Sequence, residues 1–157
     1  MNILIAKKAV IYSLILGAIL ALFGIIGFLI GLVAFALGLL CAPAVIFFMK
    51  SRNEIGFLDN QQGAALGAMV GFCSTVAYFA IFTPLVLLIH AIKPSYYSYG
   101  LPYIVSFDTF WLFLVIVVTI GILCALTNAT TGMGAIFLLF QFDKKPDDIE
   151  EIDINIE

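Results

Sequence analysis

Long uninterrupted runs of apolar residues dominate the chain, and polar residues gather in the segments between them. The first run extends from Ala9 to Met49 without a charge, the second from Gly63 to Ile92, and a third over about 109–135. A helix that crosses the roughly 30 Å hydrocarbon core of a bilayer needs about 20 apolar residues. The pattern therefore predicts membrane-spanning helices rather than the amphipathic elements of a soluble domain.

The first run is too long for a single crossing, because one helix over it would measure about 60 Å at 1.5 Å per residue. Gly27 and Gly31 flank the segment where we expect the chain to turn. The expected spans are therefore 9–28, 31–49, 63–92 and 109–135, in one membrane domain over 1–142 with short loops. The predicted fold class is all-α, a four-transmembrane-helix bundle followed by an acidic tail over 143–157.

Four spans place both ends of the chain on the same side of the membrane. Six of the seven Lys and Arg residues then fall on that side, and only Lys93 falls on the other. Because basic residues favour cytoplasmic loops, we expect both termini in the cytoplasm. We expect the bilayer to be a plasma membrane, specifically a bacterial inner membrane. The six residues are Lys7, Lys8, Lys50, Arg52, Lys144 and Lys145.

Composition excludes several classes of protein. Apolar residues make up 64% of the 157 residues, charged residues only 11%, and the mean hydropathy is +1.19. Soluble domains are about half apolar and about a quarter charged, so soluble, disordered, fibrous and nucleic-acid-binding proteins are disfavoured. The net charge of -3 misleads, because seven of the ten acids lie in the 143–157 tail. We expect that tail to be solvated, although its alternating Ile152, Ile154 and Ile156 would also suit strand pairing with a partner.

Small residues recur at helical spacing on every predicted span. In lipid, helices associate through close backbone approach and polar contacts, so such stripes predict packing surfaces. One stripe, on the third span, is the candidate for an outward face that drives formation of a homo-oligomer. Its members are Gly63, Gly67 and Gly71, and the corresponding residues on the fourth span are Gly121, Ala125 and Gly132.

The principal polar cluster within the spans surrounds Asn128. We expect its amide to pair across the bundle with Ser74 or Tyr78, with Thr131 on the same side. This surface has two interpretations: interhelical hydrogen bonding, or a polar path for a solute. Pro43 and Pro84 interrupt the second and third spans. Each predicts either a simple bend or the broken helix found at some transporter sites.

Aromatic residues crowd the predicted outer loop. Such amphipathic rings favour the headgroup level and predict an interface belt, while a binding surface for a partner or polar lipid is the alternative. Asp108 is the expected N-cap of the fourth helix. The belt residues are Tyr96, Tyr97, Tyr99, Tyr103 and Trp111.

Catalytic chemistry is not indicated. No ionisable side chain lies deep in a span, His90 is the sole histidine, and Cys41, Cys73 and Cys124 form no CxxC pair. We expect no catalytic residue, no metal and no cofactor.

The lipid bilayer is the expected partner, with a homo-oligomer or larger membrane complex. The predicted function is a non-enzymatic assembly, scaffold or accessory subunit; the alternative is a small-solute channel or transporter that is complete only as a homo-oligomer.

Overall fold

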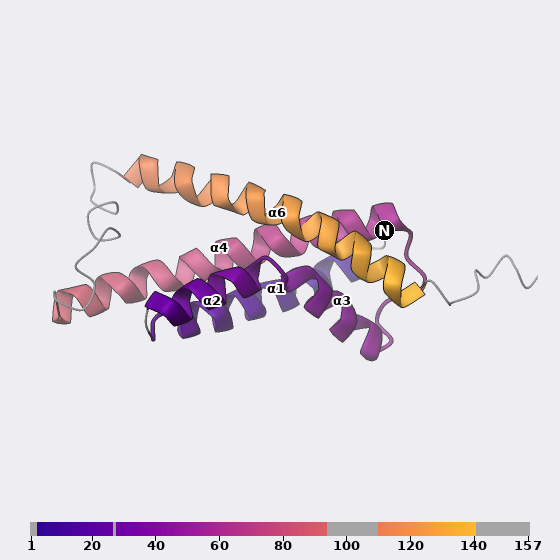
Figure 1. The fold of residues 1–157 in the computed structure, drawn as a ribbon, viewed down its shortest axis with the longest axis horizontal. Coiled ribbons are helices and arrows are strands. Elements are labelled where there is room, and N and C mark those ends of the chain that lie inside the picture. The colour runs from indigo at the N-terminus through magenta and orange to yellow at the C-terminus, as the bar shows by residue number, and fades with distance from the viewer. Residues whose placement is uncertain (1–2, 27, 94–109, 141–157) are drawn as a thin grey trace, which may run out of the picture.

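The computed structural model describes residues 3–26, 28–93 and 110–140, and this part of the chain is helical with short connections (Figure 1). No strand occurs in the described ranges, so the all-α prediction is confirmed for them. The helices are α1 (Ile3–Gly24), α2 (Phe28–Gly38), α3 (Cys41–Ser51), α4 (Asn60–Ile92) and α6 (Phe110–Phe140).

Three of these helices, α1, α4 and α6, are each long and apolar enough to cross a membrane. The short helices α2 and α3 meet at a bend of 62° and make a fourth candidate only if the pair is one span. Figure 1 shows the N-terminal end of α1, the α3–α4 connection and the C-terminal end of α6 at one end of the molecule. Successive segments therefore run in alternating directions.

The limits of α4 and α6 lie within a few residues of the third and fourth predicted spans. Helix α1 begins earlier than expected and includes Lys7 and Lys8 in its second turn. The aromatic loop over 94–109, with Asp108 and the four belt tyrosines, lies outside the described residues, as does the acidic tail.

The first turn lies earlier than predicted. Helix α1 ends at Gly24 and α2 begins at Phe28, so Gly31 is a helical residue and not part of the turn. A Cβ atom on Gly31 would lie 3.1 Å from the carbonyl oxygen of Gly24. Gly31 therefore allows close approach of the α2 and α1 backbones, which explains the glycine without placing the turn there.

Of the two alternatives for the predicted span over 31–49, a bend or a broken helix, the structure has the broken helix. Helix α2 ends at Gly38, α3 begins at Cys41, and Leu39 and Leu40 separate them. Pro43 does not form the kink itself, because it lies in the first turn of α3, where a missing N–H costs little. Pro84, in contrast, lies inside the continuous helix α4.

Glycines determine how closely the long helices pack. The most extensive pairing is α4 with α6, followed by α1 with α4. Gly67 faces the backbone carbonyl of Asn128, and a Cβ atom on Gly71 would lie 2.5 Å from the carbonyl oxygen of Cys124. On the α1 side, Gly17 faces the carbonyl of Ser74.

The stripe of Gly63, Gly67 and Gly71 is therefore not an outward face. All three residues are buried against α6 of the same chain, where a Cβ atom on Gly132 would lie 2.8 Å from the carbonyl oxygen of Gly63. Gly121 lies against the ring of Phe72, while Ala125 is only half-buried. The prediction that this stripe drives oligomer formation is corrected, because the stripe packs against α6 of the same chain and is not available to a second copy.

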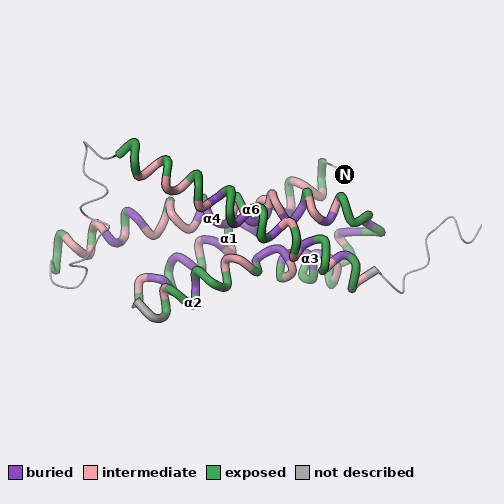
Figure 2. The backbone as a smooth tube through the Cα atoms, turned by 45° about the horizontal axis from the view of Figure 1, so that its top comes forward, coloured by how far each residue is buried: buried purple, intermediate pink, exposed green. Residues whose placement is uncertain are grey.

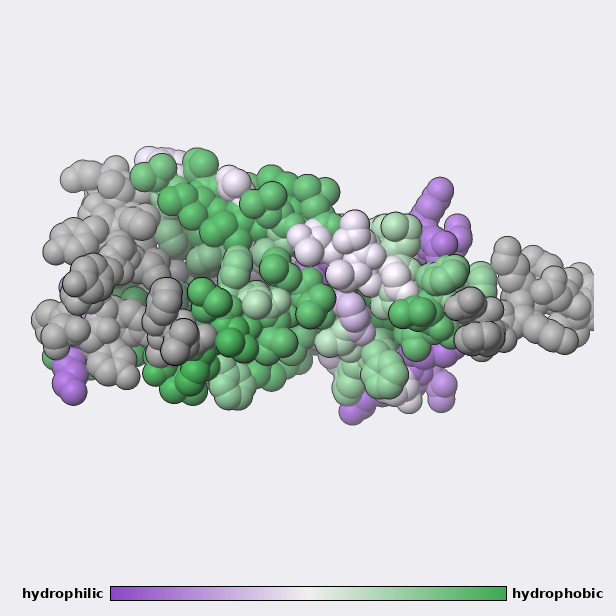
Figure 3. Space-filling view, in the orientation of Figure 1, coloured by the Kyte–Doolittle hydropathy of each residue, from purple (hydrophilic) through white to green (hydrophobic). Residues whose placement is uncertain are grey.

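Burial is confined to the narrow zone where the helices meet, and the flanks are apolar. In Figure 2 the buried positions follow the facing sides of the helices. Figure 3 shows hydrophobic side chains over the flank and strongly hydrophilic ones gathered towards the ends. That arrangement suits a protein whose flanks contact lipid, since apolar side chains then need no cover.

Gly67→Ala is expected to destabilise the protein by about 1–3 kcal/mol, because the added methyl group meets the rigid backbone of α6. Gly134→Ala is the matched control, since its Cβ would have nothing within 4 Å. Thermal unfolding in a mild detergent measures both. Equal transition temperatures for the two variants would contradict the close α4–α6 approach.

Candidate functional site

The break between α2 and α3 creates a backbone problem that the rest of the site solves. The end of a helix leaves carbonyl groups without partners, and the start of a helix leaves N–H groups without partners. Within a bilayer, water does not supply those partners, so the protein must. The backbone groups around Leu39 and Leu40 therefore need hydrogen-bond partners from elsewhere in the protein.

Asn128 on α6 bridges the two helix ends. Its Nδ2 donates to the carbonyl oxygen of Gly38 at 3.1 Å and to that of Cys124 at 2.9 Å. Its Oδ1 accepts the backbone N–H of Ala42 at 2.8 Å. The side chain is fully buried. One amide thus satisfies the last residue of α2 and the first turn of α3, while both of its donors are used.

Residues beside the break reduce the number of backbone groups that still need hydrogen-bond partners. Leu39 and Leu40 donate their N–H groups to the carbonyls of Ala36 and Leu37 at 3.2 and 3.0 Å, a tighter closing turn than that of an α-helix. Pro43 has no N–H and so removes one orphan donor from the first turn of α3. A glycine at the end of one helix and a proline just inside the next are typical of such a boundary.

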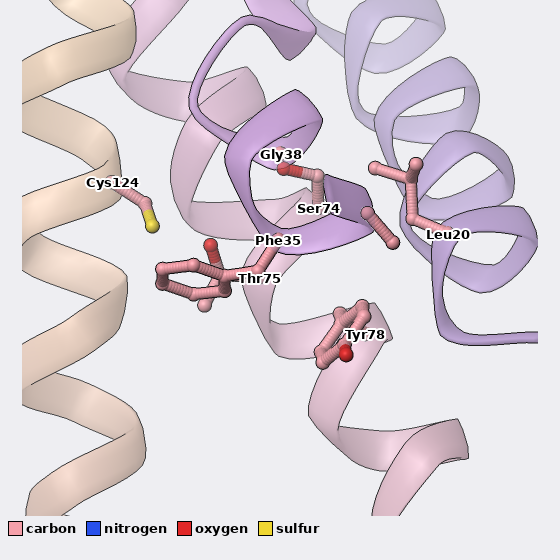
Figure 4. A pocket seen from close by; sticks show the side chains of 8 residues that line it. Leu20, Phe35, Gly38, Ser74, Thr75, Tyr78 and Cys124 are labelled. Atoms are coloured by element: carbon pink, nitrogen blue, oxygen red, sulfur yellow. The ribbon is translucent and has the colours of Figure 1, made fainter. Parts of the chain in front are cut away.

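A small cavity of about 20 Å³ adjoins the break, enough for about one water molecule (Figure 4). Ser74 and Thr75 on α4 each donate a hydroxyl proton to the carbonyl of Gly71, at 3.1 and 2.8 Å. Their oxygen atoms therefore present lone pairs rather than donors. The lining is otherwise mainly apolar and consists of Leu20, Ala34, Phe35, Gly38, Tyr78 and Cys124.

The structure divides the predicted polar surface between different places. Asn128 pairs with the α2–α3 break, so the expected bond to Ser74 or Tyr78 is wrong. Ser74 and Tyr78 line the small cavity, whereas Thr131 lines a separate groove beside α3. These side chains do not form one continuous polar path within the described chain, because the Asn128 amide is engaged by the ends of α2 and α3 and the Ser74 hydroxyl donates to its own helix.

The 62° bend sets α3 at an angle to α2. One side of α3 is buried in the bundle, and an apolar groove lies on each flank of its exposed side. The groove between α3 and α6 has a volume of about 630 Å³ and small residues along it. Its lining is Pro43, Ala44, Phe47, Thr131, Gly134, Ala135, Leu138 and Leu139. The groove between α1 and α3 has a volume of about 390 Å³ and bulkier walls. Its lining is Tyr12, Ile15, Leu16, Ile19, Ala44, Val45 and Phe48.

A polar cluster fastens the far end of α3 to α1. The Glu54 carboxylate accepts from Lys8 Nζ at 2.9 Å and from the Tyr12 hydroxyl at 3.0 and 3.2 Å to its two oxygens. The hydrogen-bonded Lys8 ammonium, helped by the Tyr12 hydroxyl, lowers the pKa of Glu54. The loop beneath is anchored by Ile55 and Leu58, which are both buried.

The end of α3 directs Glu54 into this cluster. Asn53 adopts a left-handed conformation with φ of 55°, and its N–H bonds to the carbonyl of Lys50 at 2.9 Å. The N–H of Glu54 bonds to the carbonyl of Met49, also at 2.9 Å. These two bonds define a Schellman motif, with asparagine at the position that glycine usually occupies. The reversal of the chain brings the Glu54 side chain back towards α1.

Aromatic and cationic groups complete this end. The Arg52 guanidinium lies 4.8 Å from the centre of the Phe48 ring, a cation–π distance. The Phe48 ring in turn meets Tyr12 edge-on, with 5.1 Å between centroids. Trp111, the one predicted belt residue within the described ranges, is highly exposed on α6.

In the described ranges, no group of three or more His, Cys, Asp or Glu residues is placed to hold a metal ion. Comparison with models of known families, with curated proteins and with solved structures gives no match. The site is therefore interpreted from its own residues.

Two parts of the site do not emerge from the sequence patterns above. The first part is Asn53 and Glu54, which lie in a short polar loop without a recognisable motif. The available signal is one acid among basic loop residues, a pattern that favours an ion pair. Gly38 and Pro43 each suggest packing or a bend, whereas their spacing indicates the end of one helix and the start of another. Together with Asn128, that spacing is the available signal for a supported break.

Asn128→Leu is expected to destabilise the protein by about 1–3 kcal/mol, because it leaves the Gly38 carbonyl and the Ala42 N–H unpaired in an apolar interior. It should also raise the labelling rate of the buried Cys41 thiol, measured with a membrane-permeant maleimide in a variant where Cys41 is the sole cysteine. Thr127→Val is the control, since Thr127 is exposed and bonds only to its own helix. An unchanged labelling rate would contradict the bridging role.

Glu54 predicts a pH dependence of a definite sign. Its folded pKa lies below the ordinary value of 4.5, so its contribution to stability is present above that value. The contribution is lost as the pH falls below 4.5 and through the folded pKa. Thermal unfolding of wild type and Glu54→Gln should therefore differ at pH 7 and converge under acid. A difference that grows on acidification would contradict the pairing.

Proposed function

We propose that the protein is a multi-pass plasma-membrane protein with four spans, in which α2 and α3 together form the second. Each of these helices has 11 residues, or about 16.5 Å at 1.5 Å per residue. Across the 62° bend the two together span about 28 Å, close to the roughly 30 Å of a hydrocarbon core. Lys7, Lys8, Lys50 and Arg52 lie towards one end and Lys93 follows α4 at the other. This distribution supports cytoplasmic termini.

The proposed role is that of a non-enzymatic assembly or accessory subunit, which receives a transmembrane helix of a partner protein in the α3–α6 groove. The observation that carries the proposal is the groove itself. It is open and apolar, and small residues such as Ala44, Gly134 and Ala135 line it. In lipid, small residues permit the close backbone approach on which helix association depends.

The surface beside the groove has the same character. Figure 3 shows a weakly polar patch over the C-terminal half of α6, where Thr127, Thr130 and Gly134 are exposed. The two threonines donate to carbonyls of their own helix, at 2.8 and 2.7 Å, and keep lone pairs free to accept from a neighbour. A helix with Ser, Thr or Asn at its contact face would suit this surface.

Gly134→Leu separates docking from folding. No atom lies within 4 Å of a Cβ at this position, so the variant should keep the wild-type unfolding temperature. The larger side chain fills the groove and should abolish the complex that native mass spectrometry detects after gentle extraction. Met133→Leu is the control, because Met133 is exposed on the same helix but does not line the groove.

An unchanged complex in Gly134→Leu would contradict docking in this groove.

A homo-oligomer that conducts a small solute in liposomes would instead favour a second candidate, a channel or transporter complete only as a homo-oligomer. The observation favouring that candidate is the broken helix with the small cavity beside it. In that case Ser74→Ala should reduce flux without changing the unfolding temperature.

A further inference from the structure

The groove between α1 and α3 differs in chemistry from the groove proposed to receive a helix. Apart from Ala44, its walls are branched or aromatic, with Ile15, Leu16 and Ile19 on α1 facing Val45 and Phe48 on α3. Such walls keep a neighbouring helix backbone at a distance, whereas a flexible chain of methylene groups can fill the space between them. From Tyr12 to Ile19 the groove follows α1 for about 10 Å, at 1.5 Å per residue.

The groove leads to a polar end that is rich in positive charge. Phe48 lines the groove and carries Arg52 above its ring at 4.8 Å. Tyr12 lines it as well, and its hydroxyl group is bonded to Glu54. Phe48 therefore joins the apolar groove to the cationic group, so that an occupant of the groove would have its polar end beside the guanidinium.

The cationic group beside the groove favours an anion. Among the described residues at this end, four are basic, Lys7, Lys8, Lys50 and Arg52, and two are acidic, Glu54 and Asp59. Glu54 is already paired with Lys8 at 2.9 Å. Arg52 is exposed, and a guanidinium binds phosphate oxygens through paired N–H donors.

We propose that the α1–α3 groove is a binding site for an anionic phospholipid, with one acyl chain between α1 and α3 and the phosphate at Arg52. Basic pockets between membrane helices on the cytoplasmic side recognise acidic headgroups by this chemistry. The site adjoins the helix-docking groove, because Ala44 lines both grooves, but its other lining residues are its own. A lipid bound here does not require the partner helix.

The test is native mass spectrometry of the full chain released from nanodiscs that contain equal amounts of phosphatidylglycerol and phosphatidylcholine. The wild-type protein should retain one phosphatidylglycerol in preference to phosphatidylcholine. Arg52→Gln should lower that preference about fivefold, the effect of one basic residue at an anionic surface. Lys93→Gln is the matched control, because it removes a positive charge at the other end of the molecule and should change nothing.

A second pair of variants tests the groove without touching charge. Ile15→Trp narrows the slot and should reduce retention of both lipids, whereas Leu14→Trp, at an exposed position that does not line it, should not. Equal retention of the two lipids by the wild-type protein would overturn the proposal. So would an equal loss of preference in Lys93→Gln, or a dimer that Ile15→Trp dissociates, since a second copy would then occupy the groove.

Discussion

The constraint on which this structure depends is that polar backbone groups in a hydrocarbon environment must find partners within the protein. A straight helix meets it everywhere except at its ends. Here a helix ends and another begins in the middle of an apolar segment, and Asn128 meets the constraint with one side-chain amide. Removing the Asn128 amide would leave both the Gly38 carbonyl and the Ala42 N–H without this partner, so the two helix ends depend on one side chain.

The change of direction at the break determines the surface of the molecule. Helix α3 lies at 62° to α2 and buries one side in the bundle, and a groove remains on each flank of its exposed side. The distal end of α3 is held by Glu54 against Lys8 and Tyr12. The two grooves are therefore open and yet fixed in shape, which suits surfaces that bind a helix on one side and a lipid on the other.

Sequence alone predicts the long helices because their signal, an apolar run of sufficient length, is local. It also identifies the glycines that permit close packing, but not which helix each glycine faces. The stripe from Gly63 to Gly71 looks the same whether it meets α6 or another molecule. The partner of Asn128 could not be predicted either, because the choice between Ser74, Tyr78 and a distant helix end depends on how helices far apart in the sequence are placed.

The bond between Ala42 and Asn128 joins residues that are 86 positions apart. A ribosome that adds about 5–20 residues per second needs about 4–17 s to synthesise the intervening chain. Throughout that interval the segment that becomes α2 and α3 is already in or near the membrane, without the Asn128 side chain that supports its break. A continuous helix would meanwhile satisfy this segment's backbone except at the Leu39 carbonyl, which Pro43 has no N–H to bond. The bend between α2 and α3 would then arise late in biogenesis, when α6 enters the membrane. The Asn128 side chain would at that point replace the backbone hydrogen bonds that the continuous helix loses on bending.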